Sequence, residues 1–320
     1  MSLLYATHAR IHLGGIRENL LAIRSATGPG RKVLIAVKAN GYGHGAVEVS
    51  RMAEATGTAE WLGVATVPEG LQLREAGLGL PILKLGPTFP WEMPAAVEAG
   101  LTLAVCSHQE AAEVAEAARA SGRPASVHLK VDTGMGRVGV PPEEAPALAL
   151  LLSALPGVEL GGVFTHLPVS DAADPTWTRE QVARFRAAAE DVQEAAGRRL
   201  IVHCANSGAV LGHEAAWLDM VRPGIMIYGF RPDPATPATI PLKPGMSLVT
   251  RVSFVKRVAA GTSIGYGRTW FAPRDTVVGT IPAGYADGFN RLFSNRGRVL
   301  IAGRSYPLVG RVCMDQSMVD

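Results

Sequence analysis

The first two-thirds of the chain repeats one pattern, in which a short apolar run is followed by a loop and then by an alanine-rich amphipathic segment. Many of these runs are apolar at every position, which is typical of strands buried on both faces. The segments between them have helical spacing, and the longest ends at Gly197, a residue type that commonly terminates helices. The runs are Val33–Val37, Trp61–Ala65, Pro81–Leu85, Leu101–Val105, Val127–Val131, Leu160–Phe164, Leu200–His203 and Met220–Tyr228.

Strands that alternate with helices imply right-handed crossovers and a parallel sheet. Eight such strands favour a closed (β/α)8 barrel of the TIM type over an open sheet. The pattern changes at residues 230–245, where "FRPDPATPATIPLKPG" indicates a proline-rich linker. Beyond it the apolar residues alternate as in strands, and "RVLIAGRSYPLVGRV" predicts a hairpin. We therefore expect an α/β barrel over residues 10–235 and a smaller, mostly β domain over residues 236–320, joined by residues 1–9 as an N-terminal strand.

Composition and charge exclude several classes of protein. Hydrophobic residues make up 48% of the chain and charged residues 18%, so a large core can form. The net charge is only +3 and the basic residues are scattered, which argues against a nucleic-acid partner. The N-terminal stretch "MSLLYATHARIHLGG" lacks the uninterrupted apolar core of a signal peptide, and the longest apolar stretch, residues 147–155, is too short to span a bilayer. We expect a soluble protein.

The three cysteines, Cys106, Cys204 and Cys313, are odd in number and far apart in the sequence. Their spacing predicts neither a disulfide framework nor a metal site, and it favours a reducing cytoplasm.

Polar residues gather where the predicted barrel strands end. In such barrels the chemistry lies at the carboxyl ends of the strands, and the opposite end serves stability. Polar residues concentrated at one mouth are difficult to explain as packing. They are Lys38, Lys130, Asp132, His166, Asn206, Ser207 and Arg222.

Lys38 ends a buried run and begins the glycine-rich stretch "KANGYGHG". One interpretation is a lysine that merely extends its amine to solvent. The other is an amine in a partly desolvated barrel mouth, where a lowered pKa would free the nitrogen for Schiff-base chemistry. The sequence near Lys38 alone does not decide between them.

Two glycine-bearing turns favour the second interpretation. "ANSGA" (residues 205–209) follows the seventh run, and "RPGIMIYG" (residues 222–229) lies at the eighth. Barrels frequently bind phosphate with the loops at these two positions, although either turn alone could be an ordinary loop. A Schiff-base lysine and a phosphate cradle in one mouth specify an aldehyde that carries a phosphate. Pyridoxal 5′-phosphate (PLP) fits this description.

With these features the chain resembles the alanine racemase family, whose members are PLP-dependent enzymes with a barrel and a C-terminal β domain. The resemblance covers nearly the whole length. "AVKANGYGHG" matches the family's cofactor-lysine motif and is highly specific. The other matching motifs follow in the family's order: "KVDTGMGRVG", "FTHL", "ANSGA", "VRPGIMIYG", "SIGYGRTW", "PAGYADGFNR" and "GRVCMDQSMVD".

The resemblance implies an enzyme that interconverts L-alanine and D-alanine and supplies D-alanine for peptidoglycan. Lys38 would carry PLP and act as one catalytic base. Tyr266 would be the second base, contributed by the partner subunit of a homodimer with shared active sites. His166 would link Tyr266 to Arg222, and Arg222 would face the pyridine nitrogen without giving up a full proton, because arginine stays protonated.

The same resemblance assigns the remaining site residues. Tyr42, Asn206, Ser207, Gly224 and Ile225 would hold the cofactor, and Arg137, Met314 and Asp315 would hold the substrate. Lys130 could carry a carbamate that orients Arg137; the alternative is that Asp132 alone neutralises Lys130. Asp171, Tyr285, Arg291 and Arg311 would line the path by which the substrate enters. No metal is implied.

Several alternatives remain open at the level of the sequence. They are a racemase of another small amino acid such as serine, a PLP-dependent barrel decarboxylase, a non-catalytic PLP carrier, and a Schiff-base aldolase. "SIGYGRTW" favours racemisation over decarboxylation, and the β domain argues against a carrier, which is typically a lone barrel. Family members are expected to continue past Asp320, so we also expect an unpaired strand edge in the β domain and a missing wall of the access path.

Overall fold

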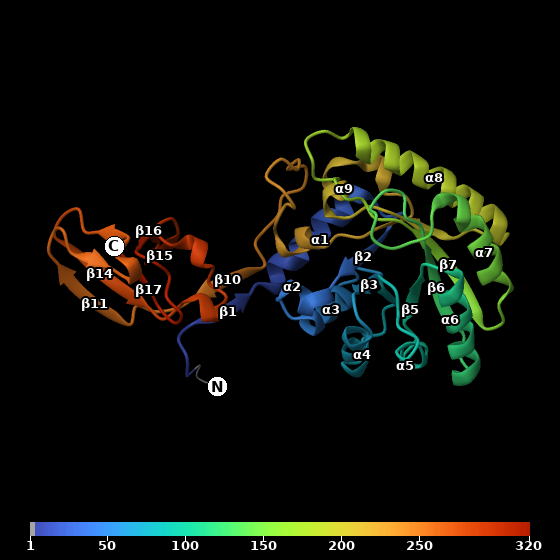
Figure 1. Ribbon diagram of the computed structural model, residues 1–320, viewed down its shortest axis with the longest axis horizontal. Helices are drawn as coiled ribbons and strands as arrows, with labels where there is room; N and C mark the ends of the chain where they lie inside the picture. The colour runs from blue at the N-terminus through green and yellow to red at the C-terminus, as the bar shows by residue number, and fades with distance from the viewer. Residues whose placement is uncertain (1–3) are drawn as a thin grey trace. The chain divides into compact units, whose positions relative to one another are not determined.

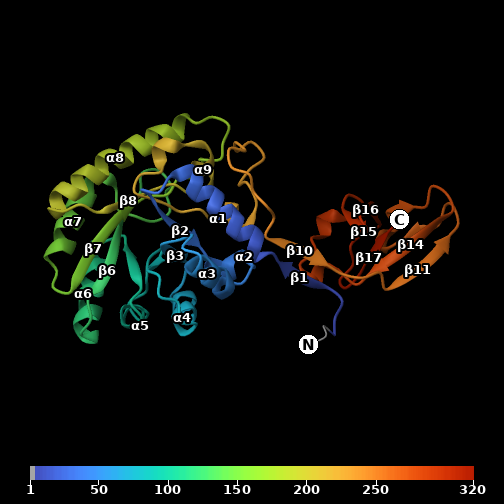
Figure 2. The same cartoon turned by 180° about the vertical axis from the view of Figure 1, so that it is seen from behind.

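The computed structural model describes residues 4–320, and its internal contacts divide the chain into two compact units (Figures 1 and 2). The larger, which we call the barrel unit, is His12–Gly245. The smaller, which we call the β unit, is Met246–Asp320 together with the N-terminal segment that ends at Ile11. Residues 1–3 of the predicted N-terminal strand lie outside the described residues.

The barrel unit is built on an eight-stranded parallel sheet, as predicted. Its strands occur in the order β8-β7-β6-β5-β4-β3-β2-β9. Backbone hydrogen bonds from Asp219 N to Val202 O (3.1 Å) and from Arg222 N to Ala205 O (2.7 Å) join the two ends of the sheet and close the barrel. The strands are β2 (Lys32–Ala36), β3 (Trp61–Val64), β4 (Ile82–Lys84), β5 (Thr102–Val105), β6 (Ala125–Lys130), β7 (Val158–Phe164), β8 (Ile201–His203) and β9 (Met220–Val221).

Helices follow the strands and cover the outside of the sheet (Figure 1). Their ends follow sequence signals. Thr66 forms a capping box with Glu69 at the start of α4, and Gly197 ends α8 in the left-handed conformation that a glycine adopts easily. The helices are α1 (Leu13–Thr27), α2 (Lys38–Tyr42), α3 (Ala46–Ala55), α4 (Val67–Glu75), α5 (Met93–Glu98), α6 (His108–Ser121), α7 (Ala145–Ala154), α8 (Thr176–Ala196) and α9 (Ser207–Gly212), with 3-10 turns η1 (Pro142–Glu144), η2 (Glu214–Ala216) and η3 (Ile225–Tyr228).

The predicted eighth strand, Met220–Tyr228, extends beyond the strand that forms at this position. Strand β9 ends at Val221, and Ile225–Tyr228 forms the 3-10 turn η3 instead. Pro223 has no N–H to donate to a neighbouring strand, so pairing cannot continue through it. The apolar residues that follow are buried because η3 packs into the unit, not because they continue the sheet.

The β unit contains strands and short 3-10 turns in its described residues, without an α-helix, as the sequence predicted. Its main sheet has the order β11-β14-β17-β16-β15, and the predicted hairpin is the antiparallel pair β15–β16. Strand β1 pairs with β10. The strands are β1 (His8–Ile11), β10 (Met246–Val249), β11 (Phe254–Val258), β12 (Ser263–Ile264), β13 (Trp270–Phe271), β14 (Thr276–Ile281), β15 (Arg298–Ile301), β16 (Arg304–Val309) and β17 (Ser317–Val319), with turns η4 (Tyr266–Arg268), η5 (Tyr285–Asp287) and η6 (Arg291–Phe293).

No helix within residues 4–320 combines the length and the apolar character needed to cross a membrane.

Candidate active site

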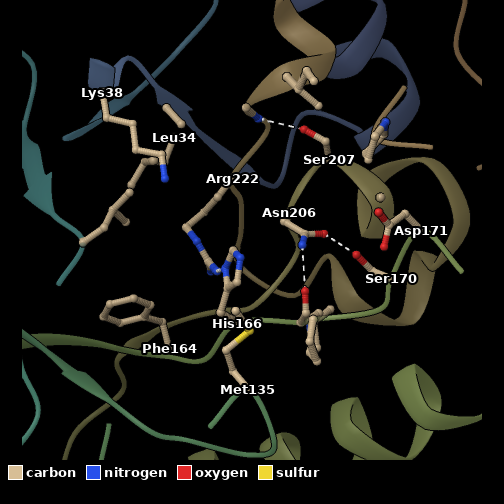
Figure 3. A pocket seen from close by; sticks show the side chains of 18 of the residues that line it. Leu34, Lys38, Met135, Phe164, His166, Ser170, Asp171, Asn206, Ser207 and Arg222 are labelled. Atoms are coloured by element: carbon tan, nitrogen blue, oxygen red, sulfur yellow. Dashed lines mark hydrogen bonds between the residues drawn. The ribbon is translucent and has the colours of Figure 1, made fainter. Parts of the chain in front are cut away.

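A cavity of about 290 Å³ opens at the carboxyl ends of the barrel strands (Figure 3). Of the residues that the sequence predicted at the barrel mouth, Asp132 does not line this cavity; the others line it, although they come from segments far apart in the chain. They are Lys38, Tyr42, Lys130, Arg137, His166, Asp171, Asn206, Ser207, Arg222, Gly224 and Ile225. The fold therefore brings these residues together around one volume.

Lys38 enters the cavity from the first residue of α2 (Figure 3). Directly after it, Ala39, Asn40 and Gly41 all have positive φ angles of 50°, 53° and 63°, so α2 is a left-handed turn. Such a conformation costs non-glycine residues roughly 1–2 kcal/mol each. Conformations of this kind persist where surrounding contacts enforce them, and they cluster at functional sites.

Glu69 provides some of those contacts. Its Oε1 accepts a hydrogen bond from Ala39 N at 2.7 Å, and its Oε2 accepts bonds from Ala65 N and Thr66 N. One carboxylate at the start of α4 thus ties the loop after β2 to the loop after β3. It holds the backbone next to Lys38 in place.

Tyr42 and the two glycine-bearing turns also line the cavity. A Cβ added to Gly224 would lie 2.8 Å from the Tyr42 hydroxyl, so this turn leaves room for the tyrosine only because residue 224 is a glycine. The Ser207 Oγ accepts a hydrogen bond from Gly224 N at 2.9 Å, which connects the two turns. Helix α9 begins at Ser207 and η3 at Ile225, and first-turn N–H groups have no partner within their own helix.

Asn206 and Ser170 complete the support of these turns. The Asn206 side chain caps α9 by accepting a bond from Ala209 N, and its Nδ2 donates to Leu167 O at 3.0 Å (Figure 3). Ser170 Oγ donates to Asn206 Oδ1 at 2.6 Å. Both Asn206 side-chain atoms are therefore occupied by the protein, which indicates that Asn206 positions the turn.

Arg222 lies deep in the cavity, with only 6% of its surface exposed. Its Nη2 donates to Thr165 O at 2.7 Å and faces His166 Nδ1 at 3.4 Å, and its Nη1 faces His203 Nδ1 at 3.0 Å. No acidic residue within the described chain forms an ion pair with it. Burial lowers the pKa of Arg222 to about 10, so the guanidinium remains charged at neutral pH.

His166 is held in its neutral form by this environment. Burial and the charge of Arg222 lower the pKa of His166 to about 3. Its Nδ1 faces a guanidinium, which can only donate, so Nδ1 accepts and the proton resides on Nε2.

Lys130 is almost fully buried and has only weak polar contacts. Its Nζ donates to Leu85 O at 3.4 Å and lies 4.4 Å from the centre of the Phe164 ring. No ion pair joins Lys130 to Asp132. Asp132 Oδ1 instead accepts bonds from Gly134 N, Met135 N and Gly136 N. Burial and Arg222 lower the pKa of Lys130 to about 7.

The charges around the cavity are unbalanced. Lys38, Lys130, Arg137 and Arg222 line it, whereas Asp171 is the acidic residue among its lining residues. A cavity with this balance suits a ligand that carries several negative charges. The described residues also contain no group of three or more His, Cys, Asp or Glu side chains placed to hold a metal ion.

The remaining predicted site residues belong to the β unit. The turn at Tyr285 and the loop at Met314 are joined by bonds from Tyr285 N to Cys313 O and from Ala286 N to Met314 O. Tyr266, Tyr285 and Met314 are 71%, 43% and 53% exposed. Arg311 lies against Gly267, next to Tyr266, while Arg291 lies on η6 and Asp315 follows Met314.

Sequence analysis missed several residues of the barrel site. Phe164, Met135 and Ser170 line the cavity, and His203 contacts Arg222. Phe164 and His203 end apolar runs, so they looked like core residues. A histidine at the carboxyl end of a barrel strand was the one signal that could have identified His203.

Comparison with known proteins agrees with this geometry. Residues 11–232 match the family described as "Alanine racemase, N-terminal domain", and residues 245–320 match "Alanine racemase, C-terminal domain". The chain belongs to the alanine racemase family. The resemblance predicted from the motifs is confirmed, and the matched ranges together span nearly all of the chain.

Alanine racemases of several bacteria are close in sequence and structure. The Cutibacterium acnes protein is 48% identical over 315 residues, which cover 98% of this chain and 84% of that protein. The Chlorobaculum tepidum protein is 45% identical over 98% of this chain and 82% of that protein. The solved structure of alanine racemase from Clostridium difficile 630 is 35% identical, has a TM-score of 0.92 and covers 99% of this chain and 83% of that chain.

Proposed function

We propose that this protein is a PLP-dependent alanine racemase that interconverts L-alanine and D-alanine in the cytoplasm and supplies D-alanine for peptidoglycan. The observation that carries the proposal is the single cavity at the barrel mouth, in which Lys38, Arg222 and the two glycine-bearing turns meet in a member of this family.

The residues around the cavity fit PLP. The Tyr42 hydroxyl, the Ser207 hydroxyl and the first N–H groups of α9 and η3 would hold the phosphate, because each can donate to its oxygens. Within the described chain, Arg222 forms its hydrogen bonds through Nη1 and Nη2. Its Nε would therefore be the atom that faces the pyridine nitrogen. Lys38 Nζ would be the covalent attachment point. When bound, PLP draws electrons from the substrate's Cα–H bond.

Racemisation requires a proton to leave one face of Cα and another to arrive on the opposite face. The two enantiomers have equal free energy, so an acid/base group on each face is the simplest arrangement that works in both directions. We assign Lys38 Nζ to one face and the partner subunit's Tyr266 hydroxyl to the other. His166, neutral and protonated on Nε2, would donate toward that tyrosine.

The substrate carboxylate would be held by Arg137 and by the Met314–Asp315 loop. Asp171, Tyr285, Arg291 and Arg311 would line the access path. Tyr266 and Met314 are more than half exposed in the chain, as expected for residues that act on a partner subunit's site in a homodimer.

Lys130 would carry a carbamate. Carbon dioxide adds to an uncharged amine, forming an N–C bond with release of one proton and leaving a carboxylate on the nitrogen. Burial and Arg222 lower the pKa of Lys130 to about 7, which makes the uncharged amine accessible at neutral pH. The product would be an anion able to orient Arg137.

Incubation with 13C-bicarbonate should give a carbamate signal in the NMR spectrum that Lys130→Met lacks. A bare Lys130 in a well-resolved structure would remove the assignment.

The proposed function is tested by assaying the purified protein with PLP. L-Alanine should lose its optical rotation and D-alanine should form, with solvent deuterium incorporated at Cα. Serine, assayed in parallel, decides between alanine and another small amino acid. Release of carbon dioxide without racemisation would instead indicate a decarboxylase.

Lys38→Ala should abolish the visible absorption of bound PLP and lower the activity by about 10²- to 10⁴-fold, the range typical of a positioned acid/base group. Lys84→Met is the matched control. Lys84 is also a buried lysine at the end of a barrel strand, but it donates to the carbonyl oxygens of Gly86 and Pro87 and does not line the cavity. If the absorption survives in Lys38→Ala and is lost in Lys84→Met, the assignment of Lys38 is wrong.

A further inference from the structure

A chain of hydrogen-bonded side chains runs from the cavity into the barrel core. Arg222 Nη1 lies 3.0 Å from His203 Nδ1, and His203 Nε2 lies 2.9 Å from His128 Nδ1. His203 and His128 are 0% and 1% exposed. Neither lines the cavity, and the function proposed above does not use either ring.

The donor direction along this chain is fixed by chemistry. A guanidinium can only donate, so His203 Nδ1 must accept from Arg222. A neutral imidazole carries one proton, which then resides on His203 Nε2 and is donated to His128 Nδ1. The proton of His128 is consequently on Nε2. One arginine thus determines the tautomers of two histidines.

Strand β7 contains two irregular features next to the ring of His128. The register between β6 and β7 shifts at Val127/His128, so that Gly161 is an extra residue in β7. A Cβ on Gly162 would lie 2.6 Å from the His128 ring. A bulge and a strand glycine both weaken a sheet, and such features mark places where a close approach is needed. Here the approaching group is the imidazole.

The surroundings keep both rings uncharged. The His203 ring stacks on the Phe164 ring with 4.9 Å between the ring centroids, and the His128 and Trp61 ring centroids lie 5.3 Å apart. The charged group in contact with the pair is the Arg222 guanidinium, and Lys130 adds positive charge near His203 only while its amine is unmodified and protonated. Burial and Arg222 lower the pKa of His128 to about 3 and lower the pKa of His203 well below its ordinary value.

We infer that His203 and His128 are positioning residues for Arg222. Two neutral imidazoles, both protonated on Nε2, hold the guanidinium in one orientation while leaving its positive charge uncompensated. A carboxylate in place of His203 would orient Arg222 equally well, but it would cancel the charge that the site presents to its ligand. The inference rests on the role proposed above for Arg222, and it concerns how that role is maintained.

The first test is the tautomeric state in the PLP-loaded protein. With 15N-labelled histidine, NMR should show His203 and His128 protonated on Nε2 and unprotonated on Nδ1 from about pH 5 to about pH 8. A proton on Nδ1 of His203, or a doubly protonated ring at either position, would overturn the inference. This measurement does not depend on racemase activity, so a failure of the proposed function would be recognised separately.

The second test compares His128→Asn with His128→Leu. Asparagine places an acceptor near the position of Nδ1, so His203 should keep its tautomer and kcat should stay within about threefold of the unsubstituted protein. Leucine leaves the His203 N–H without a partner, so kcat should fall about tenfold with little change in KM, as is usual for residues that orient an active-site group. Equal kcat values for both variants, with the His203 signal unchanged in both, would show that His128 only fills space. If the leucine variant does not fold, the asparagine variant and the tautomer spectrum still decide the question.

Discussion

The barrel unit and the β unit differ in how far their predicted site residues are exposed to solvent. In the barrel unit Lys130, Ser207 and Arg222 are buried, and hydrogen bonds or ring contacts fix Ser207 and Arg222 within the same unit. In the β unit Tyr266 is 71% exposed and Met314 53% exposed. The barrel unit therefore organises a cavity from its own residues, whereas the β unit exposes these two side chains.

This difference is consistent with the two tasks proposed above, which are holding a cofactor in the barrel unit and serving a partner subunit from the β unit. A cofactor site needs charged groups held rigidly in a low-dielectric cavity, and burial achieves this. A residue that serves another subunit must instead stay accessible until that subunit binds. The contrast between the units is the basis of the following four expectations.

The largest effect is expected from mixing two defective proteins. Lys38→Ala removes the base that we propose for the barrel unit and Tyr266→Phe the one that we propose for the β unit, so each homodimer should be nearly inactive. After dissociation and random reassociation, half of the dimers are mixed, and each of these has one intact site of two. About a quarter of the original activity should return. If exchange of tagged subunits is verified and no activity returns, the site is built within one chain.

Acid should weaken the barrel unit selectively. The pKa values of His128 and His166 are lowered to about 3 by burial and Arg222, whereas an unfolded histidine titrates near 6.5. Below about pH 6.5 the unfolded state binds more protons, so the free energy of unfolding falls as the pH falls. The loss approaches about 1.4 kcal/mol per pH unit for each histidine.

Hydrogen exchange measured at several pH values above the range where carboxylates titrate should report this loss in barrel peptides and much less in β-unit peptides. His128→Asn removes one of the buried histidines, so its pH dependence should be shallower. Equal acid sensitivity of the two units would contradict the contrast drawn between them.

Arg222→Glu should change the outcome of the reaction as well as its rate. A carboxylate favours protonation of the pyridine nitrogen, which increases the electron demand of PLP and with it side reactions. We expect racemisation to fall roughly 10²-fold, as for loss of an electrostatic contact at the reacting centre, with more pyruvate formed per turnover. Arg222→Lys keeps the charge and serves as the control. An unchanged ratio of pyruvate to D-alanine would count against the electronic role of Arg222.

The smallest effects are expected from one glycine in each unit. In Gly224→Ala the new methyl would lie 2.8 Å from the Tyr42 hydroxyl, so PLP affinity should fall about tenfold, equivalent to about 1.4 kcal/mol, with little change in melting temperature. In Gly297→Ala the methyl would lie 2.5 Å from Leu308 Cδ1, so stability should fall by about 1–3 kcal/mol with PLP affinity unchanged. If Gly297→Ala lowered the PLP affinity and Gly224→Ala left it unchanged, the cavity would not be the cofactor site.

Much of the fold could be predicted because local patterns and tertiary packing agreed. The apolar runs at Val33–Val37 and Leu160–Phe164 became strands β2 and β7, and the repeat of strand and helix became a barrel. The prediction failed for Met220–Tyr228, where continuous hydrophobicity reflected burial of a 3-10 turn. Periodicity cannot separate a buried strand from a buried turn when no polar residue marks the exposed face.

The sequence by itself determined which chemical groups are available and at which strand ends they lie. The order of the motifs identified the family, and "ANSGA" and "RPGIMIYG" marked two glycine-bearing turns at the ends of the last two predicted strands. These properties depend on residue type and on positions along the chain, which can be read without coordinates.

Only the tertiary structure decided how those groups act on one another. The uncompensated charge of Arg222, the weak contacts of Lys130 and the chain through His203 to His128 all depend on which segments become neighbours when the barrel closes. Electrostatic interactions and pKa values respond to burial and to distances of a few ångströms between residues far apart in the sequence. For that reason a histidine that looked like part of a strand core proved to be bonded to an active-site arginine.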